Sequence, residues 1–110
     1  MHRHEGFGAV ACELGKLTTT ANFCAPDPID AKLAKALTIK GAKAQTLVGK
    51  AETSTKTAQK LLNRAVKALT GLRNRVARAG DRNKITANCR GTLDALLAER
   101  LALVQGLATP

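Results

Sequence analysis

Seven basic residues recur at nearly helical spacing between residues 56 and 82. They follow one another at intervals of four, four, three, eight, three and four positions, which places them along one side of a helix. No acid occurs from residue 56 to residue 80, whereas an ordinary solvated helix face mixes acids and bases as i, i+4 pairs. Such a row can make electrostatic, sequence-independent contact with a polyanion. The row consists of Lys56, Lys60, Arg64, Lys67, Arg75, Arg78 and Arg82.

The charge of the whole chain indicates the same class of partner. Eighteen Lys and Arg against eight Asp and Glu give a formal net charge of +10, which attracts nucleic acid, anionic lipid or acidic polysaccharide. The only aromatic residues are Phe7 and Phe23, so the stacking platforms that bind single strands are absent. We therefore expect a partner that is an unknown protein or an anionic polymer. Non-specific nucleic-acid binding through the 56–82 row is the alternative, and a merely solvated helix face is the simplest interpretation.

Three cysteines, at positions 12, 24 and 89, are the next candidates for chemistry. They form no CxxC pair, and the only histidines are His2 and His4, so we predict no metal site. A Cys24–Cys89 disulfide would close a loop of about 65 residues and stabilise the fold by roughly 4 kcal/mol. Three reduced, buried cysteines and a Cys12–Cys24 bridge remain the alternatives.

The remaining residues argue against familiar catalysis. Ser54 is the only serine and stands where a helix cap is expected, so a Ser-His or Cys-His dyad has little to work with. Asp94 is expected to pair with Arg90 one turn earlier rather than with a second carboxylate. No glycine-rich phosphate loop and no ExxH motif is present. We predict no catalytic residues and no cofactor, with an enzyme of unfamiliar type as an alternative.

Helical periodicity indicates the elements that position these residues. We predict an all-α, antiparallel up-down helical bundle as a single domain over residues 1–110. Its three long helices are expected at about 28–51, 54–79 and 82–107, with a short N-terminal helix at about 8–22 and disorder at 1–7. Asp27, Thr53 or Ser54, and Asp81 are the expected N-caps, and Gly80 the residue just past the second long helix. No apolar run reaches the roughly 20 residues that a membrane-spanning helix needs, so we expect no membrane insertion.

The stretches AKLAKALTIKGAKAQTLVGKAE, KLLNRAVKALTGLRNRVARAG and ITANCRGTLDALLAERLALVQGL together give a resemblance to a type of module. Their pattern resembles the Lys/Ala-rich, cysteine-bearing helical modules of large secreted bacterial proteins. The resemblance covers about residues 22–107 and implies an extracytoplasmic (secreted or cell-surface) helical spacer or interaction domain, with no catalytic residues to carry over. A cytoplasmic location is the alternative.

The hypothesis that follows is a non-enzymatic interaction or structural module with a basic face for anionic partners. Association with a partner helix, including a second copy of the chain as a homo-oligomer, is a variant of this hypothesis.

Overall fold

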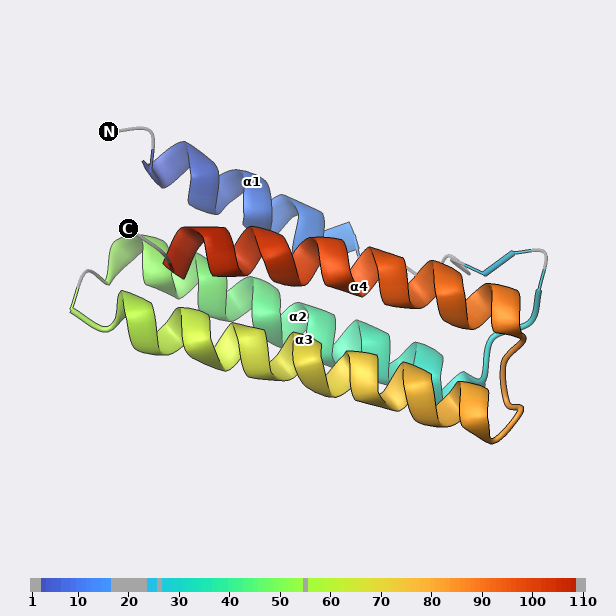
Figure 1. The fold of residues 1–110 in the computed structure, drawn as a ribbon. Coiled ribbons are helices and arrows are strands. Elements are labelled where there is room, and N and C mark those ends of the chain that lie inside the picture. The colour runs from blue at the N-terminus through green and yellow to red at the C-terminus, as the bar shows by residue number, and fades with distance from the viewer. Residues whose placement is uncertain (1–2, 17–23, 26, 55, 109–110) are drawn as a thin grey trace.

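Four α-helices make up the described part of the chain, which contains no strand. The computed structural model describes residues 3–16, 24–25, 27–54 and 56–108. The helices are α1 (Arg3–Gly15), α2 (Ala31–Thr53), α3 (Ala58–Asp81) and α4 (Ala87–Ala108). The three long helices run up, down and up beside one another, and the short α1 packs on α2 and α4 (Figure 1). The predicted all-α antiparallel bundle with a short N-terminal helix is confirmed.

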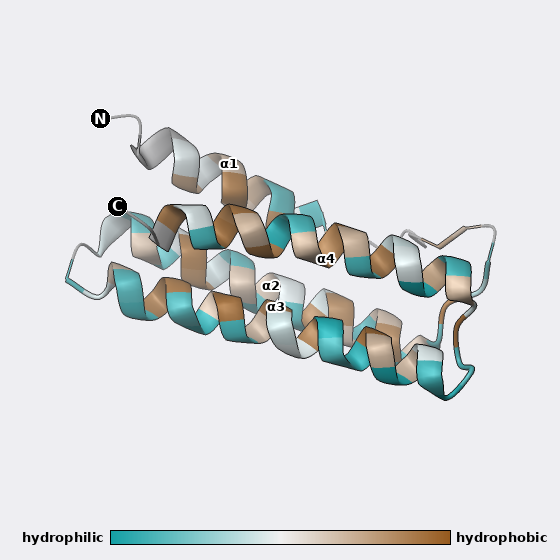
Figure 2. Cartoon of the chain, viewed as in Figure 1, coloured by the Kyte–Doolittle hydropathy of each residue, from teal (hydrophilic) through white to brown (hydrophobic). Residues whose placement is uncertain are grey.

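An aliphatic core runs the length of the bundle, which measures 44 × 21 × 18 Å. The apolar side of α3 is fully packed, with Leu62, Leu69, Leu72 and Val76 at 2% exposure or less. These positions repeat every three or four residues, so one stripe of the helix meets its neighbours while the opposite side stays wet. Figure 2 shows the result as hydrophilic and hydrophobic residues that alternate along α3, and α4 shows a similar alternation.

The N-caps of α2 and α4 differ from the predicted ones. Asp30, not Asp27, caps α2, because its carboxylate accepts the Leu33 N–H at 3.2 Å. Asp27 is instead engaged across the bundle end, where it accepts the Thr86 hydroxyl at 2.7 Å. Thr86 in turn caps α4 in place of Asp81, since its Oγ1 accepts the Cys89 N–H at 3.0 Å. Both helices therefore begin a few residues later than predicted.

The ends of α3 also differ from the prediction. Thr53 belongs to α2, Ser54 follows that helix, and Thr57 stands at the N-cap of α3 without a side-chain cap bond. At the other end the helix continues through Gly80 to Asp81.

The residue that turns the chain after α3 is Asn83 at φ 58°, because asparagine tolerates the left-handed conformation that ends a helix. The Lys84 N–H then bonds the Ala79 carbonyl at 2.9 Å, as in a Schellman motif. Gly80 has another role, since a Cβ there would lie 2.5 Å from Arg90 Cδ. Because Gly80 has no side chain, the Arg90 side chain can lie against α3 at this position and pair with Asp81 at 3.0 Å.

The first helix lies earlier in the chain than predicted. It spans 3–15 rather than 8–22, and residues 17–22 of the predicted helix lie outside the described part of the chain. The disorder predicted for residues 1–7 is wrong for 3–7, which form the first turns of α1. The physical reason is Phe7, which is buried with Val10 and Leu14 at i, i+3, i+7 spacing on the face that meets the bundle.

A disulfide joins Cys24 to Cys89, with their Cα atoms 4.8 Å apart. This is the first of the cysteine arrangements that the sequence left open. Both cysteines are buried, whereas Cys12 is a free, exposed thiol on α1. Among the described residues no group of three metal-ligating side chains comes together, and none of the described helices is both long and apolar enough to span a bilayer.

Candidate polyanion-binding seam

The basic row of α3 lies along the junction between α2 and α3. Lys56 is exposed in the turn before α3 and Lys60 is exposed in its first turn. Farther along, the row lines two separate hollows, each shared with α2. We call this junction with its two hollows the basic seam.

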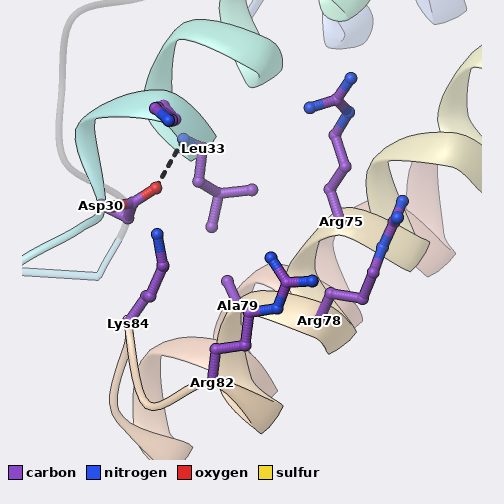
Figure 3. Close-up of a pocket in the computed structure, with 8 residues that line it drawn as sticks. Asp30, Leu33, Arg75, Arg78, Ala79, Arg82 and Lys84 are labelled. Carbon is purple, nitrogen blue, oxygen red and sulfur yellow. Dashed lines mark hydrogen bonds between the residues drawn. The ribbon is translucent and has the colours of Figure 1, made fainter.

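The first hollow lies where α2 begins and α3 ends, and we call it the arginine hollow. Its volume is about 220 Å³. Figure 3 shows Arg75 of α3 and Arg82 at its C-cap on the side of the start of α2, with Lys84 pointing toward Asp30. The Arg78 side chain lies back along α3, where its Nε donates to the Asn74 carbonyl at 3.5 Å. The lining residues are Asp30, Lys32, Leu33, Arg75, Arg78, Ala79, Arg82 and Lys84.

The second hollow lies farther toward the start of α3, and we call it the lysine hollow. Its volume is about 400 Å³. Two cations from each helix face it, with Leu47 and Ala68 at its floor. The cations are Lys40 and Lys43 from α2 and Arg64 and Lys67 from α3.

Nearly half of the seam's cations were not among the residues predicted from the sequence. The additional ones are Lys32, Lys40 and Lys43 of α2 and Lys84 of the α3–α4 connection. The sequence of α2 is also free of acids from residue 31 to residue 51, but on its own it does not show which of its five lysines lie beside α3. The signal lies in the hairpin, since an antiparallel partner places the lysines at 32, 40 and 43 beside the basic side of α3.

The cations of the seam lack internal counterions. Within the described part of the chain, none of the nine Lys and Arg that line the two hollows has an ion pair. The one lining acid is Asp30, whose carboxylate is used as the α2 cap. The lining of the two hollows therefore holds nine cations against a single acid.

Outside the two hollows, Lys16, Arg73, Arg90 and Arg100 have acidic partners among the described residues, whereas Lys35, Lys50, Lys56 and Lys60 have no ion pair there. Arg73 of α3, which lines neither hollow of the basic seam, pairs with Asp94 of α4 at 3.1 Å. Arg90 pairs with Asp81, so the predicted Arg90–Asp94 pair is wrong. Arg90 and Asp94 both line a third hollow of about 270 Å³, between α3 and α4. Its charges are already matched, which separates it from the basic seam.

The exposed thiol and its neighbours form no comparable site. Glu13, one residue after Cys12, pairs with Lys16 and also approaches Arg100 Nη2 at 3.6 Å. The hydrogen bond from Lys16, with further attraction from Lys16 and Arg100, lowers the pKa of the Glu13 carboxyl. The same pair raises the pKa of Lys16. This group of charges is balanced, and it connects α1 to α4.

The chain was compared with protein-family models, with curated proteins and with solved structures, and none of the three comparisons found a match.

Proposed function

We propose that this chain is a non-enzymatic interaction module that binds an anionic polymer along the basic seam. The observation that carries the proposal is the set of nine cations without ion pairs in the described chain, gathered from α2, α3 and the following loop onto one junction. A polymer fits better than a single small anion because the charge is spread over two hollows. From Lys67 to Arg78 the helix alone rises by about 16 Å, at about 1.5 Å per residue.

The way the charge is held supports electrostatic rather than base-specific recognition. Eight of the nine cations are exposed and Lys40 is half-buried, and no aromatic residue lines either hollow. The Cys24–Cys89 disulfide supports an extracytoplasmic setting, since disulfides persist in oxidising compartments. These features favour a polyanion encountered outside the cytoplasm over a genomic target.

A matched pair of charge-reversal variants tests the proposal. K43E/K67E places two acids in the lysine hollow, whereas K35E/K50E makes the same net change at exposed α2 positions that line neither hollow. Affinity for heparin, duplex DNA and polyglutamate is measured by titration calorimetry over a range of salt concentrations. We expect K43E/K67E to weaken binding at least tenfold more than K35E/K50E and to lower the salt slope by about two, roughly one per lost cation.

Two outcomes would contradict the proposal. Equal losses in both variants would mean that affinity follows net charge and that the seam is no site. Binding of every polyanion that disappears at physiological salt would mean that the attraction is only the general one of a basic protein.

A further inference from the structure

The two hollows of the basic seam differ in the kind of cation that lines them. Three of the four cations in the lysine hollow are lysines, with Arg64 as the exception. In the other hollow, α3 and its C-cap provide three arginines, at positions 75, 78 and 82, and Lys32 and Lys84 are the remaining cations. Charge alone does not explain this segregation, because lysine would supply the same charge.

Arginine and lysine differ in how they hold an anion. The guanidinium is a planar fork that binds two oxygens of one anion at once, whereas the ammonium acts as a point charge. A carboxylate offers two oxygens in one plane, so one or two forks satisfy it. A tetrahedral phosphate offers oxygens in several directions and can accept bonds from three forks that approach from different sides. Three arginines on successive turns therefore suit a phosphate better than a carboxylate.

The charge and size of the arginine hollow suit the same group. Five cations and Asp30, the N-cap of α2, line this hollow, which leaves a formal excess of four positive charges. A terminal phosphate carries about −1.5 to −2 at neutral pH, whereas a carboxylate and an internal phosphate of a polymer carry −1 each, so the excess charge suits the end of a phosphate chain best. The volume of about 220 Å³ is several times the roughly 30 Å³ share of one liquid water, so a phosphate group fits with its solvent.

We propose that the arginine hollow binds a phosphate group of a linear phosphate polymer whose following anions reach the lysine hollow. This inference rests on the proposed function and adds the chemical class of the polymer. The arginine hollow supplies the preference for phosphate, and the lysine hollow supplies attraction without such a preference. Asp30 holds the first turn of α2 in place at the edge of the site through its bond to Leu33 (Figure 3).

A charge-conserving variant tests the inference. R75K/R78K/R82K keeps every positive charge and removes only the forks, while R64K makes the same exchange in the lysine hollow. The probes are long-chain inorganic polyphosphate and polyglutamate of matched length. We expect the triple variant to bind polyphosphate about tenfold more weakly, as for the loss of one charge-assisted hydrogen bond, with polyglutamate affinity within about twofold of the parent. R64K is expected to keep the parent preference.

A second measurement locates the site. In a titration of the parent protein with pyrophosphate, the Nε–Hε NMR signals of Arg75 and Arg82 are expected to move together, with the Arg73 signal unchanged because that side chain pairs with Asp94. The single variant R78K, with its fold checked by circular dichroism, replaces the triple variant if the triple fails to fold.

The outcomes separate this inference from the proposed function. Equal weakening of polyphosphate and polyglutamate by R75K/R78K/R82K, or no weakening of either, overturns the phosphate assignment. The seam then still stands if K43E/K67E loses more affinity than K35E/K50E. Tighter binding of duplex DNA than of polyphosphate, lost in the same arginine variant, supports the phosphate assignment and identifies nucleic acid as the source of the phosphate.

Discussion

At the scale of single residues, Arg100 shows how this small bundle accommodates a buried charge. Its side chain is 8% exposed, with Nη1 2.9 Å from Glu99 and Nη2 3.6 Å from Glu13. Its Nε is buried and makes no hydrogen bond. A buried guanidinium with an unmatched donor is costly, and the loss of an acidic partner makes it more so. Glu13 is therefore the residue through which α1 is fixed electrostatically to α4.

The Glu13 contacts lead to a prediction about acid stability. Lys16 and Arg100 lower the folded-state pKa of Glu13 below its ordinary value of 4.5, so the carboxylate contributes stability above pH 4.5. That contribution is lost as the pH falls through the lowered folded pKa, because both states are then protonated. We expect Glu13→Gln to be less stable than the parent at pH 7, with the difference shrinking as the pH falls below 4.5, by urea unfolding at a series of pH values.

The matched control for this prediction is Glu52→Gln on α2, where the acid has no ion pair among the described residues. It should leave the pH dependence of stability almost unchanged. A stability difference between Glu13→Gln and the parent that persists undiminished at pH 3 would show that the residue acts through packing rather than charge.

At the scale of elements, α1 is too short to cover the whole bundle. It has 13 residues against 22 in α4, and it lies along the second half of that helix, where Gly6 is beside Leu107 and Glu13 beside Arg100. At the start of α4 the contacts come from two described residues between α1 and α2, Cys24 and Asp27. There Cys24 is buried and bonded to Cys89, and Asp27 receives the Thr86 hydroxyl. The disulfide thus fixes Cys24 against the start of α4.

Removal of the disulfide should therefore lower the free energy of unfolding by more than the loss of two small side chains would. The bond closes a loop of 65 residues, for which chain entropy gives a stabilisation of about 4 kcal/mol. We expect Cys24→Ala/Cys89→Ala to unfold at a much lower urea concentration than the oxidised parent. Hydrogen exchange should be fastest in the first turns of α2 and α4, which the bond brings together.

Cys12→Ala is the control for the disulfide prediction, because that thiol is free and exposed, and its stability should match the parent. A loss below about 1 kcal/mol in the double variant would mean that the Asp27–Thr86 contact and the buried surface around it hold this end without the covalent bond.

The sequence predicted the helices but not their boundaries. Periodic apolar positions over two dozen residues are a strong signal, and the buried residues of α3 are the ones that the pattern indicates. N-caps are harder to predict from sequence, because several acidic and hydroxyl side chains lie near each helix start. Tertiary contacts determine which of them caps the helix. Asp27 is near enough to cap α2, yet its contact with Thr86 fixes it elsewhere.

Only the α3 side of the basic seam could be predicted from the sequence, for a similar reason. The row on α3 is visible in one helix, because its spacing and its lack of acids are properties of a single segment. The contribution of Lys40 and Lys43 depends on which side of α2 meets α3, and Lys84 depends on the turn at Asn83. Both contributions depend on the tertiary structure, so a search limited to the periodicity of single helices finds only the α3 side of the seam.

At the scale of the whole molecule, the charge is distributed very unevenly. Helices α2 and α3 together contain eleven Lys and Arg and two acids, whereas α1 and α4 together contain three Lys and Arg and four acids. One side of the bundle is therefore strongly positive and the other nearly neutral. Such asymmetry favours binding of a polyanion to one side, and it costs stability through repulsion between like charges.

This repulsion predicts that binding and stability are in conflict at the seam. Raising sodium chloride from about 10 mM to about 150 mM shortens the screening length from roughly 30 Å to 8 Å, so the free energy of unfolding of the parent should increase. K43E/K67E, which places acids beside Lys40 and Arg64, should be more stable than the parent at low salt by about 0.5–1 kcal/mol and less sensitive to salt. Urea unfolding of the parent, K43E/K67E and K35E/K50E at both salt concentrations measures this.

If K43E/K67E were no more stable than K35E/K50E, the seam cations would not repel one another appreciably. The expected result, a variant that gains stability as it loses the polymer, would mean that these cations are kept for binding rather than for folding.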